Sequence, residues 1–224
     1  MLSHAPDIYA RIRHRLLNLA TTLDTSRHET PVPALPLWTV RDTYAHLAGN
    51  VADSLTGNVD EQGTAPWTAI HVSNRADHTL ADICTEWSGN AEAFDTAMRA
   101  DAKLWGNAFD LWHHEQDIRA ALGEPVDRDE TTVRFTIDLL VPAIAAHWPA
   151  DTPSVRVVAD DLDQDWQLGD GTPATTVHTN GYDLSRGLAG RRSRVQLETL
   201  GWHNPAPHLA HMPAFDFPEK DLTE

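Results

Sequence analysis

Three side chains of metal-ligating type are distinguished by their spacing in the sequence. Asp110 and His114 are four residues apart, so on a helix they share one face and can hold one ion between them. His46 is followed by Asn50 and Asp53, four and seven residues later, so these polar side chains also share a helical face. If the two segments are facing helices, His46, Asp110 and His114 would form a facial ligand set that leaves positions for water or substrate. Two imidazoles and one carboxylate suit Zn²⁺, and also Fe²⁺, Ni²⁺ or Mn²⁺.

The same residues also allow a structural interpretation. The chain contains 13 histidines, so some pairs of Asp and His four residues apart arise by chance. A single histidine on an amphipathic helix, such as His46, is more often a core or surface residue than a ligand. Asn50 and Asp117 are the candidates for orienting the ligands, but Asp117 could instead pair with Arg41 or Arg119 near a helix end. Spacing alone does not connect the two segments.

The helices that would position these residues can be predicted from apolar periodicity. A first helix begins near Pro6, and a Pro-rich connection over 31–36 follows it. A second helix begins at Thr39, where Asp42 three residues later resembles a capping box, and continues to about Leu55. The first helix has one apolar stripe, formed by Ile8, Ile12, Leu16, Leu19 and Leu23.

Two more long helices and one short helix complete the first half of the chain. A short helix follows Pro66, and its Trp67 and His71 could line the mouth of a site. A third long helix opens at Thr79 and continues to about Met98, and a fourth covers about 102–122 before the Gly123 stop signal. Four long helices predict a four-helix bundle over residues 1–125.

The second half has a different pattern. A helix over 131–147 is followed by short strands at about 155–158, 166–168 and 174–178, and then by a helix through Tyr182 and Leu188. We therefore expect a mostly α protein, with a small α+β domain over 126–203 and an extended tail over 204–224.

The composition limits the classes of function. The 224-residue chain carries 17 basic and 33 acidic residues, a formal charge of −16, which argues against a nucleic-acid binder and against a peripheral protein on an anionic membrane. The one cysteine, Cys84, allows neither an internal disulfide nor a cysteine-based zinc cluster. We see no signal peptide and no span long and apolar enough for a bilayer, so we expect a cytoplasmic protein. The sequence does not predict its oligomeric state.

Three segments resemble a known family. The segment 38–49, WTVRDTYAHLAG, resembles the GWTVRDVLAHL signature of the mycothiol-dependent maleylpyruvate isomerase family, within the DinB-like superfamily. The segment 110–123, DLWHHEQDIRAALG, resembles that family's E-x-x-x-H-x-x-D-I-R-x-A-L-G helix, and 190–194, GRRSR, resembles its late GRRS stretch. The order matches along most of the chain.

The resemblance implies a DinB-like bundle with a metal site of histidine, carboxylate and histidine, which matches His46, Asp110 and His114. It also implies Zn²⁺ as the metal and mycothiol as the thiol cosubstrate. The carboxylate here is Asp110 where the family pattern has Glu, which puts the exact isomerase reaction in doubt more than the metal. Arg191 and Arg192 lie in the only dense basic cluster and could hold a carboxylate of the substrate or thiol, or could serve helix start and surface pairing.

Three hypotheses follow from these observations. The leading one is a metal-dependent enzyme that uses a low-molecular-weight thiol for isomerisation or S-transfer on a small electrophilic or unsaturated substrate. The second is a thiol-independent hydrolase or secondary-metabolism tailoring enzyme in which the metal activates water. The third is a non-catalytic, metal-stabilised protein that binds a small ligand, since fold resemblance alone does not set function.

Overall fold

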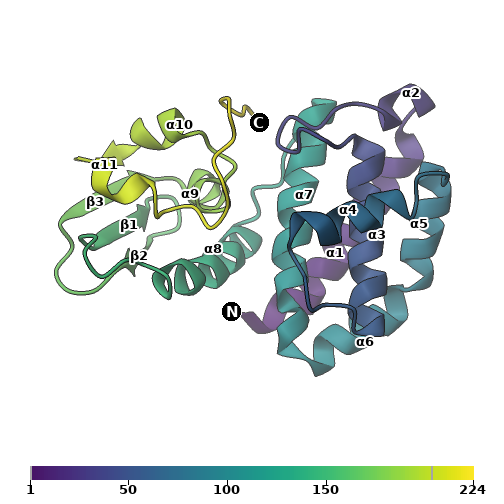
Figure 1. The fold of residues 1–224 in the computed structure, drawn as a ribbon, viewed down its shortest axis with the longest axis horizontal. Coiled ribbons are helices and arrows are strands. Elements are labelled where there is room, and N and C mark those ends of the chain that lie inside the picture. Colours follow the sequence, from purple (N-terminus) through teal and green to yellow (C-terminus); the bar gives the residue numbers. More distant parts are fainter. Residues whose placement is uncertain (1, 203) are drawn as a thin grey trace. The chain divides into compact units, whose positions relative to one another are not determined.

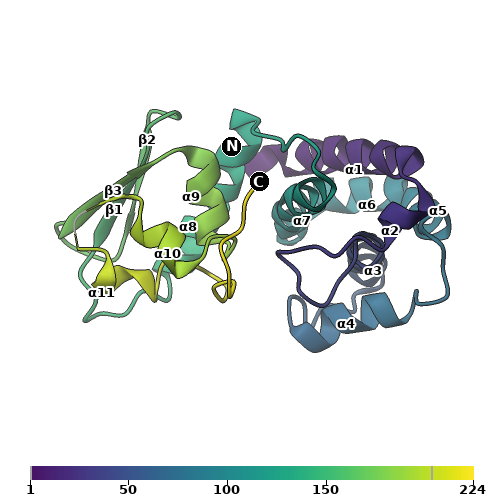
Figure 2. The same cartoon turned by 90° about the horizontal axis from the view of Figure 1, so that it is seen from above.

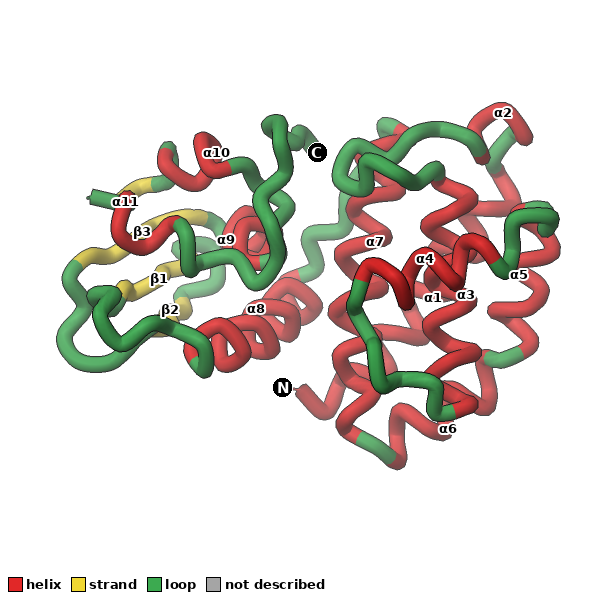
Figure 3. The backbone as a smooth tube through the Cα atoms, in the orientation of Figure 1, coloured by secondary structure: helices red, strands yellow, loops and turns green. Residues whose placement is uncertain are grey.

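The computed structural model describes residues 2–202 and 204–224, and it separates into two compact units. The first unit is essentially Ser3–Val126 and the second is essentially Asp127–Thr223. The described strands, yellow in Figure 3, lie in the second unit, and the first is built from helices and loops. Among the described residues, no helix combines the length and the apolar character that a bilayer crossing requires.

The first unit is the predicted four-helix bundle. One helix position of the bundle is occupied by two short helices, α5 and α6, and the other three by the long helices α1, α3 and α7 (Figures 1 and 2). The short helix α4 packs against α3. The helices of the unit are η1 (Leu2–His4), α1 (Ala5–Thr22), α2 (Thr25–His28), α3 (Val40–Thr56), α4 (Ala65–Ser73), α5 (Leu80–Gly89), α6 (Ala91–Ala100), η2 (Ala102–Trp105) and α7 (Gly106–Leu122).

The start and end of α3 follow from its sequence. Thr39 and Asp42 form the predicted capping box, in which Thr39 Oγ1 accepts from the backbone N–H of Asp42 and the Asp42 carboxylate accepts from the N–H of Thr39. Gly57 ends the helix with φ +78°, a left-handed conformation that glycine adopts without a Cβ penalty. The cap fixes where α3 begins, and thus the turn on which His46 lies.

Two of the expected helices are interrupted. The helix predicted from Thr79 to Met98 divides at Asn90, which caps both α5 and α6, directly after the weak helix former Gly89. The helix predicted from residue 102 begins with the 3₁₀ turn η2, because Asp101 accepts from the N–H of Lys103, and becomes α-helical only at Gly106.

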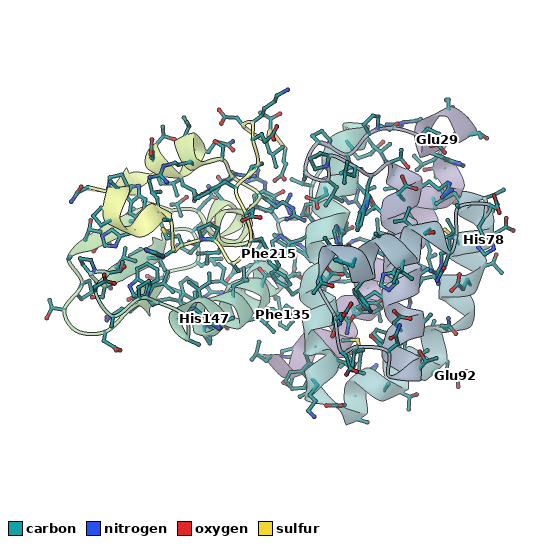
Figure 4. The ribbon with its side chains drawn as sticks, viewed as in Figure 1. Glu29, His78, Glu92, Phe135, His147 and Phe215 are labelled. Carbon is teal, nitrogen blue, oxygen red and sulfur yellow. The ribbon has the colours of Figure 1, made fainter. Side chains whose placement is uncertain are left out.

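The core of the bundle is apolar and aromatic. Trp87, Phe94 and Trp112 are fully buried, as are Ile12 and Leu16 of the predicted stripe on α1. Two later members of that stripe, Leu19 and Leu23, are only half-buried. Charged side chains such as Glu92 lie at the outside of this unit (Figure 4). The amphipathic pattern therefore explains the assembly of the bundle.

The second unit is a small α+β fold, as predicted. Its sheet has the order β2-β1-β3-β4, in which β1 and β3 are parallel and the other neighbours are antiparallel. Helices α8 and α9 pack together, α8 against β2 and α9 against β1. The elements are α8 (Glu130–Ala145), β1 (Val155–Ala159), β2 (Gln164–Leu168), β3 (Thr175–Thr179), α9 (Gly181–Leu188), α10 (Arg194–Glu198), β4 (Gly201–Trp202) and α11 (Ala206–Leu209).

The C-terminal segment 204–224 differs from the extended tail that we expected. It contains the short helix α11, and Leu209, Met212 and Leu222 are buried. These spaced apolar side chains pack into the second unit because leaving them in water would be unfavourable. The Pro-rich composition obscured them in the sequence. The short elements α10 and β4 were also missed.

Candidate functional site

The bundle brings the three predicted metal ligands together. His46 lies on α3, Asp110 and His114 lie on α7, and the two helices run side by side (Figure 2). Each residue offers one ligand atom, and these three atoms lie within 4.8 Å of one another. Asp110 Oδ2 is 3.4 Å from His46 Nε2, and Asp110 Oδ1 is 3.3 Å from His114 Nε2.

These separations suit a shared cation better than direct hydrogen bonds. Nitrogen-to-oxygen hydrogen bonds are most often about 2.9–3.0 Å long. Ligand atoms held tetrahedrally at zinc bond lengths are about 3.3 Å apart. The contacts of Asp110 with His46 and His114 lie close to the second value. The donor set therefore fits a divalent ion such as Zn²⁺.

His46 has a second buried partner on the α3 side of the cluster. Its Nδ1 is 3.1 Å from Nδ1 of His71, which comes from α4. Nε2 of His71 in turn lies 3.0 Å from Oδ2 of Asp53, two turns after His46 on α3. His71 is only 2% exposed. Contrary to our expectation, it therefore does not line the mouth of the site.

The residues expected to orient the ligands lie beside Asp110 and His114. Asn50 donates from Nδ2 to Asp110 Oδ2 over 3.1 Å. The fully buried Asp117 places Oδ2 3.4 Å from Nδ1 of His114, which makes no closer hydrogen bond to the described residues. Each of the three candidate ligands therefore has a polar neighbour outside the cluster, which is His71 for His46, Asn50 for Asp110 and Asp117 for His114.

The alternative partners of Asp117 are engaged elsewhere. Arg119 pairs with the buried Glu115, which also receives two hydrogen bonds from Arg15. Arg41 lies near Asp42 and donates to the backbone carbonyls of Arg75 and Ala76, just after the end of α4. The buried carboxylates Glu115 and Asp117 of α7 thus belong to two different groups, Glu115 to an ion-pair group with Arg15 and Arg119 and Asp117 to the cluster around His114.

The pKa values of the three candidate ligands move in different directions. Burial lowers the pKa of His46, and it also lowers that of His71 despite the nearby carboxylate of Asp53, so both rings are neutral at neutral pH. Burial alone would raise the pKa of Asp110, but the charge of His114 opposes it, and the value lies well below the usual range. Burial opposes a charge on His114, yet Asp110 and Asp117 raise its pKa to about 9.

Two indoles enclose the histidines. The ring of Trp38 lies 5.0 Å from that of His46 and 6.1 Å from that of His114, and Trp67 meets His46 edge-on at 6.2 Å. The side chains of His46 and His114 are only 3% and 7% exposed, whereas that of Asp110 is 33% exposed. Solvent therefore reaches the cluster on the side of Asp110.

The basic residues of the expected substrate contact belong to the second unit. Arg192 is buried and pairs with Asp183 at 2.6 Å, and its guanidinium lies 5.9 Å from the ring centre of Tyr182. Arg191 donates to the carbonyl of Ala189. Their role in holding a carboxylate of substrate or thiol stays a prediction.

The link between His46 and His71 was missed at the level of sequence, because the two residues belong to helices whose packing no spacing predicts. One signal was available at Gly49. A glycine in a helix interior is unfavourable unless another group approaches the backbone closely. A Cβ at this position would lie 2.5 Å from Cγ of His71, so the glycine makes room for that ring.

Comparisons with known proteins bear on the fold. Neither the protein-family models nor the curated proteins give a match to this sequence. Among solved structures, the mycothiol-dependent maleylpyruvate isomerase is similar at a TM-score of 0.59 and 12% identity, over 85% of this chain and 90% of that chain. A histidine-to-alanine mutant of that isomerase is similar at a TM-score of 0.58 and 11% identity, with the same coverage.

These similarities confirm the fold that the sequence motifs predicted. The match covers 85% of this chain, so it must include most of the bundle and most of the α+β unit. At 11–12% identity it establishes a shared fold. The activity must be argued from the cluster itself.

Proposed function

We propose that this chain is a metal-dependent enzyme that uses a low-molecular-weight thiol on a small electrophilic or unsaturated substrate. One observation carries the proposal. In the fold of a mycothiol-dependent isomerase, His46, Asp110 and His114 converge from two helices with their ligand atoms within 4.8 Å of one another.

The donor set supports a catalytic rather than a purely structural metal. Structural zinc sites are usually closed by four protein ligands, whereas catalytic sites have three and keep a position for water or substrate. The cluster offers three ligands among the described residues, and solvent reaches it beside Asp110. We propose Zn²⁺ as the metal, because two imidazoles and a carboxylate suit it.

A bound divalent cation would lower the pKa of a coordinated thiol, so that the nucleophilic thiolate forms near neutral pH. The residues of the chain prepare the site for this chemistry. Asn50 orients the carboxylate of Asp110, and Asp117 provides a negative neighbour for the outer nitrogen of His114. Trp38 and Trp67 keep water from the histidine side of the cluster.

We propose mycothiol as the thiol, by similarity to the solved isomerase. In an isomerisation, the thiolate would add to one carbon of a cis double bond, the new single bond would rotate, and the carbon–sulfur bond would break to release the trans product. In an S-transfer, the carbon–sulfur bond would remain and a leaving group would depart. Such a reaction is consistent with a cytoplasmic protein, where small thiols are kept reduced.

The first test is the metal content of the purified protein. We expect about one equivalent of a transition metal by elemental analysis, and its loss in His114→Ala and in His46→Ala, because each removes one of three ligands. His14→Ala is the matched control, since His14 is exposed on α1 of the same unit and should not change the metal content. Full stoichiometry in either ligand variant would refute the assignment.

The second step tests the use of a thiol. The metal-loaded protein would be assayed with maleylpyruvate and with the electrophile monochlorobimane, each with and without mycothiol. Turnover that requires both mycothiol and the metal supports the proposal. Turnover without a thiol would favour a metal-activated water, and metal binding without turnover of any probe would favour a ligand-binding protein.

A further inference from the structure

The helix α4 brings a histidine to the far side of the candidate metal ligand His46. Nδ1 of His71 and Nδ1 of His46 are 3.1 Å apart, and His71 Nε2 is 3.0 Å from the carboxylate of Asp53. The side chains of His46 and His71 are 3% and 2% exposed, and that of Asp53 is 20% exposed. Asp53, His71 and His46 thus form a chain of polar contacts that ends at the cluster.

The direction of this chain follows from the chemistry of its members. The carboxylate of Asp53 only accepts hydrogen bonds, so Nε2 of His71 must carry the hydrogen. A neutral imidazole has one donor and one acceptor, so Nδ1 of His71 accepts from Nδ1 of His46. Nε2 of His46 is then the nitrogen with the free lone pair. Placed 3.4 Å from a carboxylate oxygen of Asp110, that lone pair is favourable only with a cation between them.

The bundle holds His71 in this place from two directions. Gly49 leaves the backbone of α3 uncovered, and a Cβ there would lie 2.5 Å from Cγ of His71. At the end of α4, Arg75 donates to the carbonyl of His71 over 3.1 Å and forms a double hydrogen bond with Glu86 on α5. His71 is therefore fixed against α3 both by the space at Gly49 and by this anchor.

We infer that His71, held by Asp53, is a positioning residue that fixes the tautomer and ring orientation of His46 and so directs its Nε2 to the metal. This inference rests on the proposed function. Outer partners of ligating histidines generally fix the ring and increase its basicity. Here the outer partner of His46 is a second histidine, His71. The other ring nitrogen of His71 contacts the carboxylate of Asp53, which lies two turns after His46 on α3.

The test is a Co²⁺ titration of the metal-free full chain, followed by calorimetry and by the visible absorption of the bound ion. His71→Leu removes the acceptor and leaves an apolar side chain in its place, and we expect it to weaken Co²⁺ binding about 10-fold to 100-fold and to alter the spectrum. His71→Asn supplies a carbonyl oxygen near the position of Nδ1 and should restore most of the affinity.

A pair of acidic residues provides the charge control. Asp53→Ala should weaken Co²⁺ binding, whereas Asp60→Ala, at an exposed position in the loop before α4, removes the same charge and should not. Wild-type affinity and spectrum in His71→Leu would overturn the inference. Equal losses in His71→Leu and His71→Asn would also overturn it, because they would indicate a packing role.

Two further outcomes keep the test decisive. If His71→Leu fails to fold, Gly49→Ala takes its place, because the added methyl displaces His71 while alanine favours the helix. Undiminished Co²⁺ binding in Gly49→Ala would overturn the inference. A wild-type protein that binds no Co²⁺ would overturn both the proposed metal site and the inference. If the wild type binds Co²⁺ and the variants bind it equally well, the inference alone fails.

Discussion

The cluster has an α3 side, formed by His46 with its neighbours His71 and Asp53, and an α7 side, formed by His114 with Asp110 and Asp117. The two sides surround their histidines differently. On the α3 side, His46 contacts the neutral ring of His71, and burial lowers the pKa of His46. On the α7 side, His114 lies between the carboxylates of Asp110 and Asp117, which raise its pKa to about 9 against the effect of burial. One histidine is therefore ready to donate a lone pair at neutral pH, and the other holds a proton.

The charge on His114 also bears on the balance of charge within the buried cluster. The proton on His114 offsets part of the negative charge of Asp110 and Asp117, which would otherwise repel each other in the interior. A metal ion would replace that proton. On the α7 side, the proton of His114 competes with the metal. On the α3 side, His46 is already neutral, and its neighbours instead set the direction of its lone pair.

The largest effect that tests this comparison is the pH dependence of metal binding. His114 can bind an ion only after losing its proton, and its pKa is about 9, so affinity should rise about 10-fold per pH unit from near pH 6.5 and level off near pH 9. His46 adds no second proton in this range, because its pKa is lowered. Titration of Co²⁺ against a chelator of known affinity would measure the slope.

Calorimetry in buffers of different ionisation enthalpy gives an independent check of that slope. We expect about one proton released per ion at pH 7, since His114 alone is protonated among the three ligands. Affinity that does not change between pH 7 and pH 9 would mean that the two histidines titrate alike, and the comparison of the two sides would fail.

A smaller effect is expected from Asp117→Asn, which keeps the shape of the side chain and removes its charge. The pKa of His114 should fall, so the pH at which affinity levels off should fall too. Above pH 9, where proton competition is absent, the loss of a carboxylate partner should weaken binding about 10-fold. At pH 7 the two effects oppose each other, so the net change should be smaller.

The matched variant lies on the other side of the cluster. His71→Leu should weaken binding without moving the pH at which affinity levels off, because His71 contacts His46 and not His114. If Asp117→Asn and His71→Leu gave the same pH profile, the division of roles between the α3 side and the α7 side would be wrong.

The two sides also differ in how far the sequence predicted them. The α7 side has its residues on one helix, so the spacing of Asp110, His114 and Asp117 was enough to place them together. The bundle was predictable because capping residues and apolar stripes are local signals. The motif resemblance, rather than spacing, joined His46 to this helix.

The α3 side was less predictable because it depends on packing between helices. His71 lies on a nine-residue helix whose docking against α3 depends on Gly49 and on the Arg75–Glu86 pair. His71, Arg75 and Glu86 lie on other segments and have no periodic relation to His46, and Gly49, three residues after His46, does not by itself indicate which group packs against it. Similarly, Leu209, Met212 and Leu222 are too few in a Pro-rich segment to give a sustained helical or strand pattern, so their packing was not expected.

The smallest effect is expected from Asp110→Glu, which lengthens the carboxylate that the two sides share. Both residues are established zinc ligands, so metal should be retained with affinity changed by less than about 10-fold. Asp110 is the most exposed of the three ligands, which leaves room for the added methylene. Elemental analysis and the Co²⁺ spectrum would measure retention and geometry. Loss of the metal in Asp110→Glu would instead mean that the shorter side chain, held by Asn50, sets the distance between the α3 and α7 sides.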